Sequence, residues 1–194
     1  MTQKAFFTKE AIIEAAFTVT REQGWESVTA RNIAKRLGSS TMPIYSSMGS
    51  MDEIQTEVKA RAEQLLLDFQ SRDYGGDNPM NMAMGYVTFA RDERHLFRFL
   101  FDFQGERPAT RREDTGNAVP LDRMIAAGPV HLADQVPTAM RDPRILKSWI
   151  FTHGLASMVS AGVLDLPDEK IRSLLLESGA AFFGFEEKKE KENG

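Results

Sequence analysis

Helical periodicity is the feature that most constrains the fold of this 194-residue chain. Apolar residues recur three or four positions apart along much of the sequence, and no segment shows a convincing β-strand alternation. The clearest stretch contains Ile54, Val58, Ala62, Leu65 and Phe69 on one helical face. The pattern therefore predicts an all-α protein.

Capping residues divide this pattern into separate helices. Thr8 and Thr29 precede two helices that we expect to stop at Gly24 and Gly38. Ser50 and the glutamate three positions later form a capping box in front of a long helix. Further helix starts are indicated at Asn78-Pro79, Asp142-Pro143 and Asp168-Glu169.

Composition limits the environment of the protein. The chain has no cysteine, which excludes disulfides and cysteine-based zinc sites. It also has no apolar run near the roughly 20 residues that span a bilayer, and its N-terminus lacks the apolar stretch of a signal peptide. We therefore expect a soluble, cytoplasmic protein without a membrane partner.

The charge distribution is compatible with nucleic-acid binding. Residues 1–50 contain six Lys or Arg and four Glu, so their net charge is +2. The remaining 144 residues have a net charge of −6, which gives −4 for the whole chain. Between Ser27 and Met51 there are three basic residues and no acidic one. A basic face on an acidic body permits attraction to phosphate, although an ordinary solvated helix face would also explain three charges.

Residues 38–53 form an unusual connection between two predicted helices. Gly38 can reverse the chain, and Pro43 is tolerated because it falls in the first turn of a new helix, where its missing N–H has no intrahelical partner. Ile44 is the expected inward anchor. The outward-facing residues would be Thr41, Met42, Pro43, Tyr45, Ser46 and Ser47. This arrangement is typical of a helix-turn-helix, whose second helix enters the major groove of DNA.

A set of small, capping and anchoring residues recurs at defined spacings in this region: Ile12, Ala15-Ala16, Gly24, Thr29, Ile33-Ala34, Gly38 and Ile44-Tyr45. This pattern resembles that of the TetR family of transcriptional regulators. A second match, Asp92, Phe97, Leu100-Phe101, Trp149 and His153-Gly154-Leu155-Ala156, resembles the C-terminal domain of a TetR subgroup with a Trp-His-Gly signature.

The resemblance implies a fold and a set of partners. It implies an N-terminal three-helix helix-turn-helix domain, residues 1–52, and a larger C-terminal helical bundle domain, residues 53–194, for effector binding and dimerisation. The protein would be a homodimer that binds a palindromic double-stranded DNA operator, and a small-molecule effector would release it. The resemblance therefore implies a repressor and not an enzyme.

Individual DNA-binding residues can be assigned from the same resemblance. Base edges would be contacted by Arg31, Thr41, Met42 and Pro43, and phosphates by Thr29, Tyr45, Ser46 and Ser47. The hydroxyls of Ser39 and Ser40 can also donate to phosphates or bases. Four positions depart from the family pattern: Ser46, Ser47, Met48 and Met51. These departures keep open an alternative, an all-α small-molecule-binding protein whose DNA binding is weakened or lost.

The larger domain concentrates methionine and phenylalanine, which suit an adaptable cavity for an apolar or amphipathic ligand. The predicted effector residues are Met84, Phe97, Phe101, Trp149 and His153. Taken singly, each apolar member is better explained as ordinary core, and His153 can contact an effector or a partner or be satisfied by packing. Residues 104–117 could form a connection that gates the cavity.

Small and apolar residues near the C-terminus predict a dimer interface made by the last two helices of each subunit. The predicted interface residues are Ser157, Ala161, Leu175, Ser178 and Phe182. No cofactor or metal is expected, because His95 and His131 lack a convincing set of ligand-spaced partners. No catalytic triad or phosphate-binding glycine loop is present in the sequence either.

Overall fold

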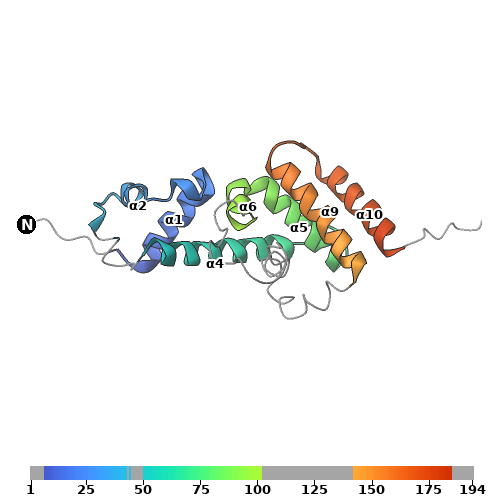
Figure 1. The fold of residues 1–194 in the computed structure, drawn as a ribbon, viewed down its shortest axis with the longest axis horizontal. Helices are drawn as coiled ribbons and strands as arrows, with labels where there is room; N and C mark the ends of the chain where they lie inside the picture. The colour runs from blue at the N-terminus through green and yellow to red at the C-terminus, as the bar shows by residue number, and fades with distance from the viewer. Residues whose placement is uncertain (1–6, 43, 45–49, 102–141, 185–194) are drawn as a thin grey trace, which may run out of the picture.

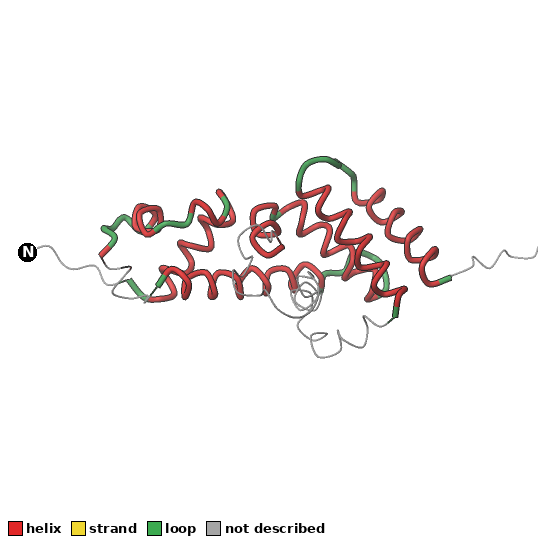
Figure 2. Tube along the Cα trace, viewed as in Figure 1, coloured by secondary structure: helices red, strands yellow, loops and turns green. Residues whose placement is uncertain are grey.

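Figure 1 shows a computed structural model of the chain, which describes residues 7–42, 44, 50–101 and 142–184. These residues form helices and connections and contain no β-strand (Figure 2), so the predicted all-α class is confirmed. The elements are α1 (Lys9–Gln23), the short 3-10 helix η1 (Trp25–Ser27), α2 (Ala30–Arg36), α4 (Met51–Gln70), α5 (Asn78–Asp92), α6 (Arg94–Phe101), α9 (Pro143–Ser160) and α10 (Asp168–Phe183).

Two hydrophobic cores lie along the length of α4, which extends beneath both groups of helices in Figure 1. The N-terminal core is formed by buried residues of α1, α2 and the start of α4, with Val28 and Ile44: Ile12, Ile13, Ala15, Ala16, Val19, Val28, Ala30, Ile33, Ala34, Ile44, Ile54 and Val58. The C-terminal core includes Ala62, Leu66 and Phe69 of α4 together with residues of α5, α6, α9 and α10. The predicted domain boundary between residues 52 and 53 therefore falls at the start of a helix that both cores share.

Helix α5 is the centre of the C-terminal bundle. Its residues 84–90 are all buried, and α4, α9 and α10 pack around it. A helix that is covered on several sides needs apolar or small residues around most of its circumference, as the sequence of α5 provides.

The capping signals locate most helix starts correctly. The side chains of Thr8, Thr29 and Ser50 accept hydrogen bonds from the amides three residues later at 3.1–3.2 Å. Asp142 caps α9 by accepting from the amide of Arg144 at 2.9 Å. These side chains satisfy amides that have no partner within the first turn of a helix.

The start of α5 was predicted one residue too late. Asp77, rather than Asn78, is the cap: its backbone is extended (φ −69°, ψ 172°) and its carboxylate accepts from the amide of Met80 at 3.0 Å. Asn78 has already entered the helix, and Pro79 occupies the second helical position. An aspartate and an asparagine side by side both suit a cap, so the sequence alone did not separate them.

Helices α4 and α5 approach each other most closely at Gly85. A Cβ atom at this position would lie 2.4 Å from the carbonyl oxygen of Phe69 and 2.6 Å from the Cα of Gln70. Both neighbours are backbone atoms, so rotation of a side chain cannot relieve the contact. Glycine is therefore required for the two helices to pack at this distance.

No helix in the described segments is both long enough and apolar enough to cross a membrane.

Gly85→Ala should destabilise the protein by about 1–3 kcal/mol, because the added methyl group forces α4 and α5 apart. Urea unfolding of both proteins at one fixed protein concentration measures the difference. Gln64→Ala, on the exposed side of α4, is the control and should change the free energy of unfolding by no more than about 0.5 kcal/mol. Equal stability of Gly85→Ala and the wild type would show that the two helices can separate without cost.

Candidate functional site

Helix α2, the first helix of the predicted helix-turn-helix, has a well-defined start and end. The amide of Asn32 donates to the Thr29 hydroxyl oxygen at 3.1 Å, and the Asn32 side chain donates to the carbonyl of Ser27 at 2.7 Å. At the other end Gly38 has φ +64°, and the amides of Gly38 and Ser39 donate to the carbonyls of Lys35 and Ala34. These two bonds form a Schellman motif, which turns the chain directly after α2.

The residues after this turn separate into one buried anchor and an exposed surface. Ile44 is only 1% exposed and belongs to the N-terminal core, whereas Met42 is 68% exposed. Ser40 and Thr41 are exposed as well, and the amide of Ile44 donates to the carbonyl of Thr41 at 3.2 Å. The predicted DNA-contacting residues Pro43, Tyr45, Ser46 and Ser47 lie outside the described residues.

The three basic residues of this region are not equivalent. Arg36 donates two hydrogen bonds to Glu22 of α1, at 2.8 and 2.9 Å, and so ties α2 to α1. Arg31 and Lys35 are exposed and have no ion pair within the described part of the chain. The cations available to a phosphate or a base edge on α2 are therefore Arg31 and Lys35.

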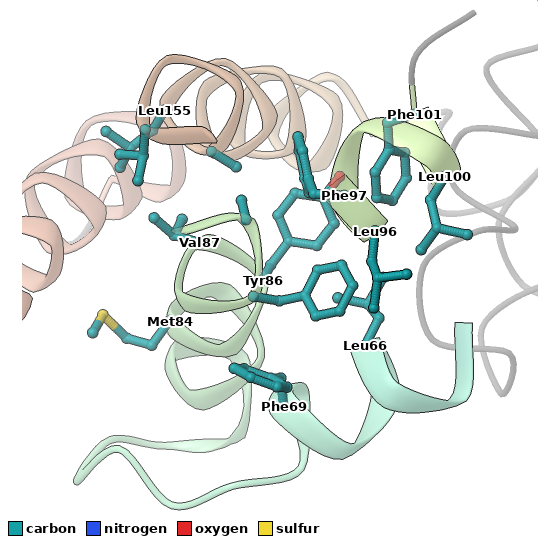
Figure 3. Packing of buried hydrophobic residues seen from close by; sticks show 14 of the residues in the cluster. Leu66, Phe69, Met84, Tyr86, Val87, Leu96, Phe97, Leu100, Phe101 and Leu155 are labelled. Carbon is teal, nitrogen blue, oxygen red and sulfur yellow. The ribbon is translucent and has the colours of Figure 1, made fainter. Parts of the chain in front are cut away.

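Five aromatic side chains of the C-terminal bundle form a second candidate site, which we call the aromatic cluster. It consists of Tyr86 from α5, Phe97 and Phe101 from α6, and Trp149 and His153 from α9. The rings of Trp149 and His153 are stacked, with centroids 4.9 Å apart and an angle of 7° between their planes. Figure 3 shows Tyr86, Phe97 and Phe101 converging between α5 and α6.

One hydrogen bond joins two members of the aromatic cluster. The phenol oxygen of Tyr86 lies 2.9 Å from Nδ1 of His153. Burial raises the pKa of the Tyr86 phenol, so the hydroxyl keeps its proton. Burial also lowers the pKa of His153 from its ordinary value, which favours the neutral imidazole.

The structure brings together four of the five predicted effector residues. Met84 is buried in the C-terminal core on the other side of α5 from Phe97 and Phe101 (Figure 3). Two positions along an α-helix correspond to a rotation of about 200°, so Met84 and Tyr86 point in nearly opposite directions. Tyr86 was not among the predicted effector residues, although a tyrosine in an apolar helix needs a partner for its hydroxyl, which is a signal that the sequence contains.

Helix α6 contacts the aromatic cluster on one side and the N-terminal part of the protein on another. Phe97 and Phe101 contact the ring of His153, with centroids 6.0 and 5.6 Å away. Phe99, on the same helix, stacks on Trp25 of η1, with centroids 5.0 Å apart. Phe99 also packs against both hydrophobic cores. Helix α6 therefore joins the aromatic cluster to the N-terminal core.

An ion pair holds α1 at the same junction. Nε of Arg21 on α1 donates to Glu93 at 2.7 Å, and a second guanidinium nitrogen bonds to the other carboxylate oxygen. Glu93 lies between α5 and α6 and is only 6% exposed. A buried carboxylate requires such a partner, so Arg21 fixes the position of α1 against the start of α6.

The predicted dimer-interface residues do not all lie on the surface. Leu175 is part of the C-terminal core, and the Ser178 hydroxyl is buried and donates to the carbonyl of Leu175 at 2.9 Å. Phe182 is half-buried against Phe151 of the same chain. Ser157 is half-buried, and Ala161 is exposed. The predicted stripe on α10 thus faces inward, because α10 uses it to cover α5 and α9 within the chain.

The surface that α9 and α10 expose is apolar at other positions. Large hydrophobic residues that remain exposed on these helices and the turn between them are Ile145, Ile150, Met158, Val163, Leu176 and Phe183. Apart from Met42, no other large hydrophobic side chain in the described residues is comparably exposed.

Metal-binding groups do not gather in the described segments: no three His, Asp or Glu side chains there lie close enough together to hold an ion. The predicted gating connection at residues 104–117 and His131 lie outside these segments.

Comparisons with known proteins agree with this architecture. Residues 80–178, about half of the chain, match the family model described as "Tetracyclin repressor-like, C-terminal domain". The chain is also similar to an uncharacterized HTH-type transcriptional regulator, Rv0681 of Mycobacterium tuberculosis. The two are 23% identical over 167 residues, which cover 83% of this chain and 74% of the relative. The family-model match spans α5 to α10 and includes the aromatic cluster, and the chain belongs to the TetR family of transcriptional regulators.

Proposed function

We propose that this regulator is a repressor that binds a palindromic operator as a homodimer and is released by a small apolar or amphipathic effector. The observation that carries the proposal is the position of α6, which contacts Trp25 through Phe99 and His153 through Phe97 and Phe101. A ligand that moves α6 would therefore act on the N-terminal helices without any further connecting element.

The DNA-binding part of the proposal is supported by the exposed residues around the turn after α2. Arg31 can donate two hydrogen bonds to a guanine, and Met42 can contact a thymine methyl group. The exposed hydroxyl of Thr41 adds a donor and acceptor next to Met42. Met42, next to the buried anchor Ile44, exposes enough of its side chain to make this apolar contact.

The effector part is supported by the aromatic cluster. Trp149 and His153 are only half-buried, whereas Tyr86, Phe97 and Phe101 are fully buried behind them. Aromatic walls with a few polar atoms are typical of sites for small apolar ligands. A ligand seated on Trp149 and His153 would touch the same imidazole ring that Phe97 and Phe101 of α6 contact.

The ion pair between Arg21 and Glu93 couples the movement of α1 to that of α6. Separating the two charges would leave Glu93 buried without its guanidinium partner, which typically costs several kcal/mol. When α6 shifts, it is therefore more favourable for α1 to move with it. In a dimer, this would change the separation of the two DNA-binding units and weaken operator binding.

The homodimer is supported by the apolar surface of α9 and α10. Ile150 and Met158 lie on one line of α9, with Gly154 between them, and Leu176 and Phe183 lie on one line of α10. Apart from the adjacent residues and backbone of α9 itself, no atom of the described residues lies within 4 Å of a Cβ at Gly154, so that position leaves room for a neighbour. Two helices from each subunit would form a four-helix interface on this surface.

Arg31→Ala should weaken operator binding by about 1–3 kcal/mol for each lost base contact and relax specificity at one position of each half-site. The DNA is the region upstream of the protein's own gene, and binding is measured by fluorescence anisotropy against random DNA at the same salt concentration. The loss should be larger on the upstream DNA than on random DNA.

Arg36→Ala is the matched control, because Glu22 already holds the Arg36 guanidinium. It should leave the preference for the upstream DNA unchanged. An equal loss for Arg31→Ala on both DNAs would mean that Arg31 contacts only phosphate. No binding of the wild type to any DNA would instead favour the alternative, an effector-binding protein that has lost DNA binding.

Leu176→Glu should convert the dimer into monomers, because it places two charges in the apolar interface while the isolated chain tolerates a side chain that is already 54% exposed. Light scattering reports the mass of each protein. Gln64→Glu introduces the same charge on an exposed position of α4 and should stay dimeric. A dimeric Leu176→Glu would place the interface away from α10.

A further inference from the structure

We propose that Tyr86 fixes His153 as a hydrogen-bond donor through Nε2, and that the effector is a neutral, planar molecule with a carbonyl oxygen that accepts this bond. The inference rests on the effector site proposed above and specifies its chemistry. It assigns a role to a hydrogen bond between two residues 67 positions apart, which packing alone would not require.

The direction of the hydrogen bond follows from the environment of Tyr86. Its side chain is 5% exposed, and within the described residues the partner of its hydroxyl is Nδ1 of His153. A buried hydroxyl that found no acceptor would lose the hydrogen bond that it makes with water when exposed. Tyr86 therefore donates to Nδ1, which must carry no proton.

The position of the remaining proton follows. A neutral imidazole has one N–H group, and if Nδ1 is an acceptor, the proton is on Nε2. No residue in the described part of the chain accepts a hydrogen bond from Nε2 of His153. His153 is half-buried, so this donor is available to a ligand at the edge of the cluster.

The side chains around His153 indicate which kind of ligand group accepts the hydrogen bond from Nε2. Within the described residues, His153 contacts the side chains of Tyr86, Phe97, Phe101 and Trp149, and none of these would compensate a full charge on a ligand. Burying an uncompensated carboxylate is much less favourable than burying a carbonyl group that receives one hydrogen bond. A ketone, ester or lactone oxygen thus fits Nε2 better than a carboxylate does.

The shape of the ligand follows from the stacked pair. Trp149 and His153 lie 7° from parallel, so their half-buried edges form one flat border. The ring planes of Phe97 and Phe101 lie at 31° and 69° to the imidazole plane, and both rings contact the imidazole from α6. A flat ring can pack along such a border with less loss of conformational freedom than a flexible chain.

The first measurement determines the tautomer of His153 in the full-length protein. Long-range proton–nitrogen correlation spectra of protein with labelled histidine should show the proton of His153 on Nε2. In Tyr86→Phe, which keeps the ring and removes the hydroxyl, both tautomers should appear. Tyr74→Phe removes another phenol hydroxyl of the same bundle and should leave the His153 signals unchanged. A proton on Nδ1 in the wild type would overturn the inference.

The second measurement compares the affinities of three probes by equilibrium dialysis, which needs no signal from His153 and therefore applies to every variant. Acetophenone and α-methylstyrene have the same shape, and a CH₂ group of the second replaces the carbonyl oxygen of the first; benzoate carries a charge. The ratio of acetophenone to α-methylstyrene affinity should be about 3- to 10-fold higher in the wild type than in His153→Phe. Tyr86→Phe should lower this ratio partly, and Tyr74→Phe should not lower it.

The outcomes separate this inference from the proposed function. An equal ratio in the wild type and His153→Phe, or tighter binding of benzoate than of acetophenone, overturns the neutral-carbonyl assignment and leaves the effector site in place. Equal weakening of both neutral probes in Tyr86→Phe would show that Tyr86 has only a structural role. Failure of all three probes to bind the wild type would overturn the effector site itself. If His153→Phe does not fold, the tautomer of the wild type still decides the first half of the inference.

Discussion

The rest of the structure depends on one helix, α4, whose side chains pack in two hydrophobic cores at once. At 20 residues α4 is about 30 Å long, which is close to the diameter of a small domain. Ile54 and Val58 pack in the N-terminal core, and Ala62, Leu66 and Phe69 pack in the C-terminal core. Because a helix of this length is stiff, a rotation of α4 in one core changes the packing of its residues in the other. The two parts of the chain are therefore coupled by a shared element rather than by a flexible linker.

Helix α6 adds a second connection of a different kind. It is only eight residues long, yet it places Phe99 against Trp25 and both Phe97 and Phe101 against His153. The pair of Arg21 and Glu93 holds α1 at the point where α6 begins. Rigid packing alone would fix α6 in one position, whereas a ligand at the aromatic cluster can change the contacts on one side of it. These observations give a physical basis for coupling between the aromatic cluster and the N-terminal helices. The proposed probes and variants test its first step, which is ligand binding at the aromatic cluster.

The proposed function places its three contacts at exceptions to good packing. Met42 remains exposed beside the buried anchor Ile44, and the apolar residues of α9 and α10 remain exposed on a surface with room at Gly154. His153 remains half-buried among rings that are otherwise covered. Each exception has a different partner in the proposed function: DNA for Met42, a second subunit for α9 and α10, and an effector for His153.

The sequence by itself determined the features that depend on neighbours within about four residues. Thr29, Ser50 and Gly38 define helix ends through bonds inside a single turn, so the helical class and the first half of the helix-turn-helix were predictable. Only the tertiary structure decided which neighbour covers each apolar stripe. Leu175 turned inward because α10 covers α5 and α9 of its own chain, and a stripe of apolar residues does not reveal whether its partner is the same chain or another. The contact of Tyr86 with a histidine 67 residues away likewise required the folded bundle, because helical periodicity gives the direction of a side chain but not the element that it meets.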